Sequence, residues 1–136
     1  MFLLWLPWLA YAGMIFFLSS IPGDGFPRIT LGKGILPDFI ADNPDKVVHM
    51  GLYAILTWLA FRAMTIRHPG RIFRAMWVAV LLSSAYGASD EFHQRFTPHR
   101  SCDVYDWVAD TVGAILGVLV CYWIYSKRAR AASRPL

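Results

Sequence analysis

Charged side chains are scarce in this chain. Only 16% of its 136 residues are Asp, Glu, Lys or Arg, whereas 57% are hydrophobic, and the mean hydropathy is +0.43. A soluble domain of this length buries only about two thirds of the surface of its unfolded chain. It could not remove so much apolar side chain from water. The composition therefore excludes a soluble domain and predicts a membrane protein.

Cysteine is nearly absent, and the common metal-binding spacings are missing. Cys102 and Cys121 are separated by 19 positions of one expected helix, which is about 28 Å at 1.5 Å per residue and exceeds the reach of a disulfide. Neither lies in a CxxC motif, and the chain has no HExxH motif. The sequence thus predicts no disulfide between them and no cofactor, with a divalent metal held by His, Asp and Glu side chains as the alternative.

A basic leader is also missing from the start of the chain. No Lys or Arg precedes the first apolar run and no small-x-small cleavage site follows it, so we expect a permanent helix and not a secretory signal. Four apolar segments approach the roughly 20 residues that cross a bilayer. We predict an all-α polytopic membrane protein, a compact bundle of four transmembrane helices in one domain, residues 1–136. The expected helices are about 2–20, 45–65, 72–94 and 102–125.

The distribution of Lys and Arg predicts the orientation. Eight lie around the second connector and in the tail at 126–136, against five in or beside the first and third connectors. The positive-inside rule then places both termini in the cytoplasm. The net charge of +4 follows from this topology, so we predict no nucleic-acid partner, and the basic tail is expected to lie on anionic lipid.

The first connector, residues 21–44, contains four prolines and four glycines. These residues interrupt regular structure, so no long helix is expected there. Its apolar stretch at 35–40 either lies on the membrane as a lid over a site or belongs to a disordered loop. The sequence leaves both alternatives open.

Residues 83–117 hold five of the nine carboxylates of the chain. Asp103, Asp106, Asp110, Gly113 and Gly117 follow at spacings of 3, 4, 3 and 4, which places them on one face of a helix. Ser101 is expected to cap that helix. An acid near the middle of a membrane costs about 2.5–3.5 kcal/mol and normally faces the bundle interior.

Small residues beneath these acids predict close helix packing. Gly113 and Gly117 form a GxxxG pair, and Gly87 lies on the polar face of the preceding helix. Such glycines let two backbones approach closely. The partner backbone belongs either to the same chain or to a second protomer, so a homo-oligomer through the Gly113/Gly117 face is one prediction.

Polar side chains of three expected helices should converge near the outer face of the bundle. Close carboxylates beside an imidazole supply an acid and a base, and His49, Asp90 and Glu91 are the best catalytic candidates. Arg100 is expected to be the counter-charge, or to clamp a phosphate. The predicted cluster consists of Asp45, Lys46, His49, Tyr53, Asp90, Glu91, Gln94, Arg100, Asp106 and Asp110.

Two stretches of the sequence resemble the signature blocks of the VanZ-like family, small bacterial membrane proteins named for a teicoplanin-resistance determinant. They are DKVVHMGLYAIL at 45–56 and SDEFHQRFTPHRSCDVYDWVADTVGAILG at 89–117. The first carries the DK..H helix start of the family. The second carries DE.HQ, a Pro-x-Arg-Ser turn and a D...D..G...G helix. One departure is His99, where the family pattern has glycine.

The resemblance implies a multi-pass protein of the bacterial cytoplasmic membrane, linked to the cell envelope or to antibiotic tolerance, and it names no reaction. Two hypotheses follow. In the first, the outward-facing pocket binds a membrane lipid or a lipid-linked or amphiphilic envelope ligand and contributes to teicoplanin tolerance. In the second, the chain is a hydrolase or transferase acting on a lipid-phosphate or lipid-linked substrate at the outer leaflet.

Overall fold

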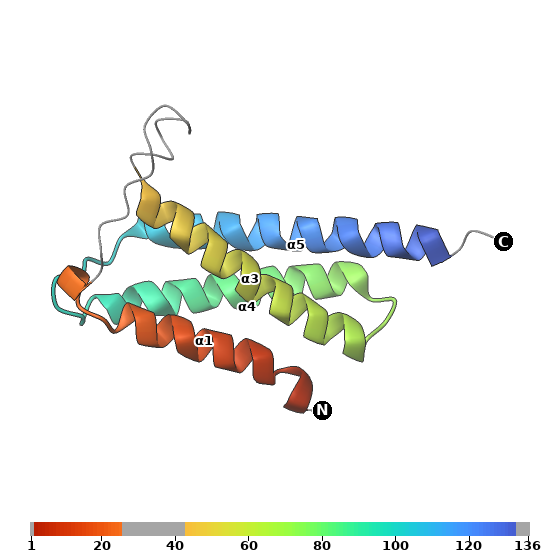
Figure 1. Ribbon diagram of the computed structural model, residues 1–136, viewed down its shortest axis with the longest axis horizontal. Coiled ribbons are helices and arrows are strands. Elements are labelled where there is room, and N and C mark those ends of the chain that lie inside the picture. Colours follow the sequence, from red (N-terminus) through yellow and green to blue (C-terminus); the bar gives the residue numbers. More distant parts are fainter. Residues whose placement is uncertain (1, 26–42, 133–136) are drawn as a thin grey trace.

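The computed structural model describes residues 2–25 and 43–132, and this part of the chain is helical without a strand. The expected lid at 35–40 lies outside these residues. The helices lie side by side in Figure 1, and the first α-helix begins and the last one ends toward the end of the molecule that carries the α3–α4 turn. The all-α prediction is confirmed. The helical elements are η1 (Phe2–Leu4), α1 (Leu6–Ser19), η2 (Gly23–Gly25), α3 (Pro44–Arg67), α4 (Ile72–Gln94) and α5 (Val104–Ala132).

Three of these helices, α3, α4 and α5, are long and apolar enough to cross a membrane. The first helix is shorter than the predicted 2–20, because α1 has 14 residues, or about 21 Å, against a hydrocarbon core of about 30 Å. Its start follows from Pro7 in the first turn, where proline is favoured because its missing N–H needs no partner there. A fourth span through α1 stays a prediction.

The last helix differs from its predicted range of 102–125 at both ends. It begins at Val104, because Asp103 Oδ1 accepts a hydrogen bond from the Tyr105 N–H at 2.9 Å. Asp103 thus takes the capping role that the sequence assigned to Ser101. At the other end the helix continues to Ala132 through basic residues, where Lys127 Nζ lies 4.2 Å from the Trp123 ring centroid.

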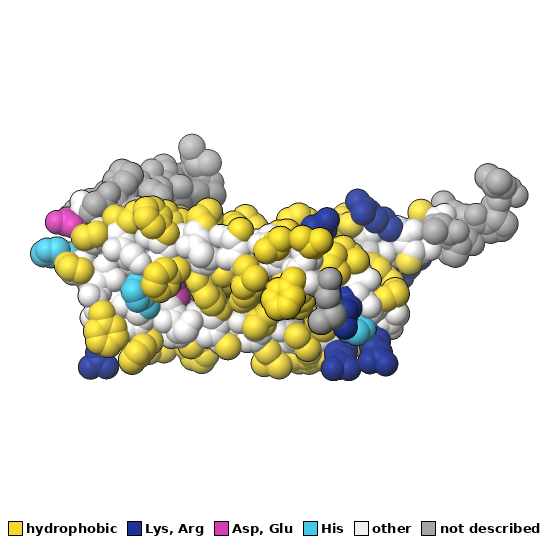
Figure 2. All heavy atoms as spheres, turned by 90° about the horizontal axis from the view of Figure 1, so that it is seen from below, with side chains coloured by type: hydrophobic (Ala, Val, Ile, Leu, Met, Phe, Trp, Pro, Cys, Tyr) yellow, Lys and Arg dark blue, Asp and Glu magenta, His cyan; other side chains and the backbone are white. Residues whose placement is uncertain are grey.

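The surface of the bundle is that of a membrane protein. Large apolar side chains such as Phe73, Trp77 and Leu119 are exposed, and Figure 2 shows hydrophobic side chains along the middle of the molecule. In the same view most Lys and Arg side chains gather toward the end with the C-terminus. An apolar belt with cations at one end matches the pattern expected from the positive-inside rule.

The close contact of α3 with α5 depends on two glycines. A Cβ built on Gly113 would overlap the backbone of Met50, and one built on Gly117 would lie 2.6 Å from the Ala54 carbonyl oxygen. Within the chain, therefore, α3 covers the GxxxG face, which is the intramolecular of the two alternatives. A homo-oligomer through this face remains an untested prediction.

Helix α1 packs against the middle of the bundle. Ala12 and Ile15 are buried with Tyr53 and Leu56 of α3, and the Tyr86 hydroxyl donates to the Ala12 carbonyl at 2.6 Å. These contacts fix the height of α1 relative to α4. They bring the last turn of α1 beside the polar end of α4.

We predict that Gly113→Ala destabilises the bundle by about 2 kcal/mol, because the new methyl group forces the two backbones apart. Gly51→Ala is the matched control on α3, since its Cβ would meet nothing within 4 Å. There the higher helix propensity of alanine predicts an unchanged or slightly raised stability. Thermal unfolding in detergent, followed by circular dichroism, measures both. Equal stabilities of the two variants would contradict this account of the α3–α5 contact.

Candidate functional site

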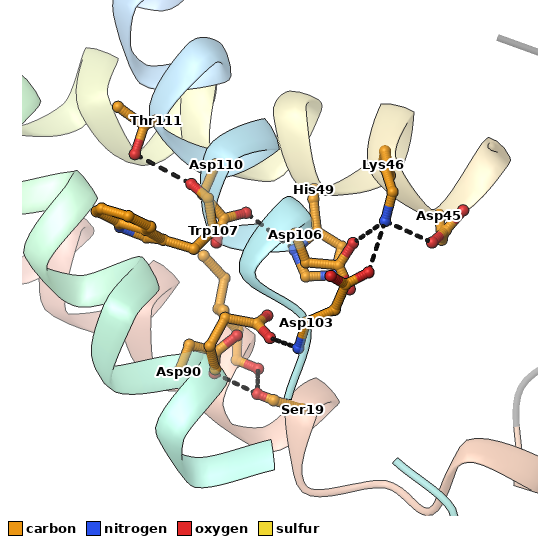
Figure 3. Close-up of polar contacts among 12 residues, drawn as sticks. Ser19, Asp45, Lys46, His49, Asp90, Asp103, Asp106, Trp107, Asp110 and Thr111 are labelled. Atoms are coloured by element: carbon orange, nitrogen blue, oxygen red, sulfur yellow. Dashed lines mark hydrogen bonds and ion pairs between the residues drawn. The ribbon is translucent and has the colours of Figure 1, made fainter. Parts of the chain in front are cut away.

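Ionisable side chains collect at the end of the bundle that carries the α4–α5 turn (Figure 3). They come from the first turns of α3 and α5 and the last turns of α4. We call them the polar cluster and describe them in three groups, defined by the side chains Lys46, His49 and Asp90.

The Lys46 group joins the first turns of α3 and α5. Lys46 Nζ lies 2.6 Å from Asp106 Oδ1, 3.1 Å from Asp103 Oδ2 and 3.5 Å from Asp45 Oδ2. Asp106 is nearly buried, whereas the Asp45 side chain is 59% exposed and contributes least. One ammonium group is thus shared by three carboxylates. It compensates part of the negative charge that the first turns of α3 and α5 bring together.

Asp103 connects the Lys46 group to α4. Hydrogen bonds from the Tyr105 N–H and from the Lys46 ammonium hold the pKa of Asp103 below its ordinary value, because both stabilise the ionised carboxylate. The backbone N–H of Asp103 in turn donates to Glu91 Oε2 at 3.0 Å. The residue therefore orients Glu91 as well as capping α5.

The His49 group lies deeper, between α3, α4 and α5. His49 Nδ1 is 2.9 Å from Asp110 Oδ1, and the two side chains are 13% and 0% exposed. Gly87 makes room for Asp110, because a Cβ there would lie 2.8 Å from Asp110 Oδ2. One imidazole nitrogen of His49 and one carboxylate oxygen from each of Glu91 and Asp110 all lie within 4.8 Å of one another.

Several buried polar atoms around this group have no hydrogen-bond partner among the described residues. Glu91 Oε1 and Asp110 Oδ2 are two of them, and the Tyr53 hydroxyl is a third. Leaving a buried polar atom unpaired costs about 1–3 kcal/mol, and more if the group is charged. Buried polar groups are normally paired, so these three atoms are exceptions to the rule. Ser83 Oγ and Thr57 Oγ1 are also unpaired.

The Asp90 group holds α1 against α4. Ser19 Oγ donates to Asp90 Oδ1, and Gln94 Nε2 donates to Asp90 Oδ2 at 3.2 Å. Thr97 Oγ1 also donates to the Ser19 carbonyl at 3.3 Å. Both oxygens of Asp90 are therefore used in buried hydrogen bonds, one to Ser19 of α1 and one to Gln94 on α4 itself. This makes Asp90 a less suitable catalytic group than the sequence suggested.

Arg100 was expected to balance the acids or to clamp a phosphate. Among the described residues, its guanidinium group donates to the carbonyls of Ile21 and Leu18, at 3.3 and 3.5 Å, and to Gln94 Oε1 at 3.5 Å. A cation at the last carbonyls of a helix satisfies them and interacts favourably with the helix dipole. In this structure Arg100 thus supports the end of α1.

The turn before Arg100 contains His99, at the position where the family pattern has glycine. His99 has a φ of +57°, a left-handed conformation that glycine adopts without steric cost. Here a histidine accepts that cost of about 1–2 kcal/mol. The Gly23 N–H donates to the neighbouring Pro98 carbonyl at 3.2 Å, so the turn packs on the start of the first connector.

The structure brings most of the predicted residues to one end of the bundle, but in three groups. Ser19 and Asp103 were not among the predicted site residues. A serine pair at the end of a charge-free helix was the available signal for Ser19, and the stripe spacing was the signal for Asp103. His93 lies apart from the His49 group, 3.0 Å from Ser20 Oγ and stacked near Phe16.

The family model described as VanZ/LLP1 matches residues 4–125, which includes all three groups of the polar cluster. No curated protein and no solved structure matches the chain.

We predict that Lys46→Met lowers the free energy of unfolding by about 2 kcal/mol, because it leaves the carboxylates of Asp103 and Asp106 uncompensated. This value lies between the effects of breaking an exposed and a buried ion pair. Arg128→Met, an exposed cation of the tail, is the control and should have little effect. Thermal unfolding of both variants measures the difference. A Lys46 variant as stable as the control would show that the three carboxylates need no ammonium group.

Proposed function

This chain belongs to the VanZ/LLP1 family, and from that premise we propose that its polar cluster binds the headgroup of a lipid-linked or amphiphilic ligand of the cell envelope. The proposal places the protein in the bacterial cytoplasmic membrane, with the α4–α5 turn outside and both termini inside. Sequestering or positioning such a ligand is how the protein would contribute to teicoplanin tolerance.

The observation that carries the proposal is the set of unpaired buried atoms on three helices. Glu91 Oε1, Asp110 Oδ2 and the Tyr53 hydroxyl have no hydrogen-bond partner within residues 2–25 and 43–132, although their residues are at most 3% exposed. A cluster that served only to lock helices together gains most when every oxygen is paired. The Asp90 group has that character, and the His49 group does not.

An apolar groove supports an amphiphilic ligand. It lies between α3 and α5, and Ala54, Trp58, Gly117 and Val120 are among its lining residues. Ala54 and Gly117 follow His49 and Asp110 by five and seven positions, which is about 7–10 Å deeper along the helices. A ligand with its headgroup at the polar cluster could place a hydrocarbon chain along this groove.

Charge restricts the headgroup. The polar cluster contains six carboxylates but only three basic side chains, Lys46, His49 and Arg100. The two permanent cations, Lys46 and Arg100, already contact protein oxygens. A bare anionic group would meet a site rich in carboxylates, which repels it. The cluster therefore favours a headgroup with amine or hydroxyl donors, or a phosphate accompanied by a cation.

The second candidate function is a membrane hydrolase or transferase for a lipid-linked substrate. The His49–Asp110 contact favours it, because a carboxylate that orients an imidazole is a common arrangement for general acid–base catalysis. Glu91 offers a further carboxylate nearby. A nucleophile among the neighbouring side chains is not identified, so a water molecule would have to take that role.

We predict that purified wild-type protein in nanodiscs binds the amino-sugar derivative of a long-chain polyprenyl phosphate, or the polyprenyl phosphate itself together with a cation. Asp110→Asn is expected to weaken the binding at least tenfold. The substitution removes the carboxylate that holds His49 and keeps the shape of the side chain. Native mass spectrometry measures lipid retention. Release of phosphate or of the amino sugar by the wild type, lost in Asp110→Asn, would select the enzyme.

Asp24→Asn is the matched control, because Asp24 is exposed in η2 and is not part of the polar cluster. It should bind like the wild type. Should a correctly folded wild type retain neither probe lipid better than phosphatidylcholine, the proposed function is wrong. Should Asp110→Asn bind as well as Asp24→Asn, the ligand binds elsewhere.

A further inference from the structure

The His49 group has the composition and the spacing of a metal site. His49, Glu91 and Asp110 come from α3, α4 and α5, and their donor atoms lie within 4.8 Å of one another. A tetrahedral zinc ion with bonds of about 2.1 Å keeps its ligand atoms about 3.4 Å apart. Zinc binding therefore needs the ligand atoms to move closer together by up to about 1.4 Å.

We propose that His49, Glu91 and Asp110 form a binding site for a divalent transition-metal ion of the zinc class. One imidazole nitrogen and two carboxylate oxygens make a borderline donor set, which suits zinc better than calcium or magnesium. Three protein ligands also leave the fourth position of a tetrahedral ion open, as in catalytic zinc sites.

An independent observation is the pair of unpaired carboxylate oxygens. Glu91 is 3% exposed and Asp110 0%, yet Glu91 Oε1 and Asp110 Oδ2 lack a hydrogen-bond partner among the described residues. A buried, uncompensated carboxylate is unfavourable in an apolar bundle. His49 contacts only one oxygen of Asp110, whereas a dication between the two carboxylates would compensate both of them.

The surroundings hold the ligands in place. The Asp103 N–H donates to Glu91 Oε2, and Gly87 leaves the space that Asp110 occupies. Outer hydrogen bonds of this kind orient metal ligands and raise affinity. A bound metal ion would take the place of the proton shared by His49 Nδ1 and Asp110 Oδ1.

The ion would add two positive charges to a polar cluster in which carboxylates outnumber cations. A phosphate oxygen can occupy the open position, so the ion would attract an anionic headgroup into a site rich in carboxylates. This step rests on the proposed function, whereas the metal site does not.

The test uses the full-length, tag-free protein in detergent, stripped with a chelator and dialysed against zinc. We expect one zinc ion per chain in the wild type and in Asp24→Asn, measured by mass spectrometry of the metal. Glu91→Gln and Asp110→Asn keep the side-chain shapes and should bind at least tenfold more weakly. Circular dichroism and gel filtration show that each variant is folded.

X-ray absorption of the zinc-loaded wild type decides the matter without a variant. One imidazole and oxygen ligands at about 2.0–2.2 Å support the site. A folded wild type that takes up no zinc overturns the proposal. So does a ligand shell containing sulfur or several imidazoles, or equal binding by Glu91→Gln and Asp24→Asn.

Lipid binding is then compared between zinc-loaded and chelator-treated protein, with polyprenyl phosphate as the probe. Binding that falls at least tenfold after chelation joins the metal to the proposed function. Zinc binding at His49 without any effect on the lipid leaves the metal site standing and counts against the phosphate ligand alone.

Discussion

The close approach of α3 and α5 is the constraint on which the polar end of the molecule depends. Gly113 and Gly117 let the α3 backbone lie directly against α5. At that distance the first turns of the two helices place Lys46 opposite Asp106 and His49 opposite Asp110. Wider spacing would separate these pairs and leave carboxylates unpaired in an apolar environment, where they are costly. Packing and electrostatics therefore support one another in this bundle.

Helical periodicity made the acidic face of α5 and the bounds of α4 predictable from the sequence. The spacing from Asp103 to Gly117 places acids and glycines on one face, and α4 has the bounds 72–94 that the sequence indicated. Both follow from local rules, because a residue's face depends only on its position along its own helix. An acid deep in an apolar segment must also turn inward, which correctly placed Asp110 inside the bundle.

Contacts between distant segments were beyond such rules. The pairing of Ser19 with Asp90 joins residues 71 positions apart, and it depends on how far α1 slides along α4. The position of Arg100 at the carbonyls that end α1 was not predicted either. The negative end of a helix dipole attracts a cation there. The prediction that Ser101 caps α5 was wrong for a local reason. Serine and aspartate both cap helices well, and the sequence does not decide between two candidates so close together.

Two adjacent residues of α4 differ in how completely their carboxylate oxygens are paired. Asp90 and Glu91 are about 100° apart around the helix axis, so Asp90 faces α1 while Glu91 faces α3 and α5. Both oxygens of Asp90 are paired, and one oxygen of Glu91 is not. A purely structural role for the whole polar cluster would require the same degree of pairing on both faces. The difference between these neighbours is therefore the strongest argument that the α3–α5 side of α4 serves a ligand, while its α1 side holds the bundle together.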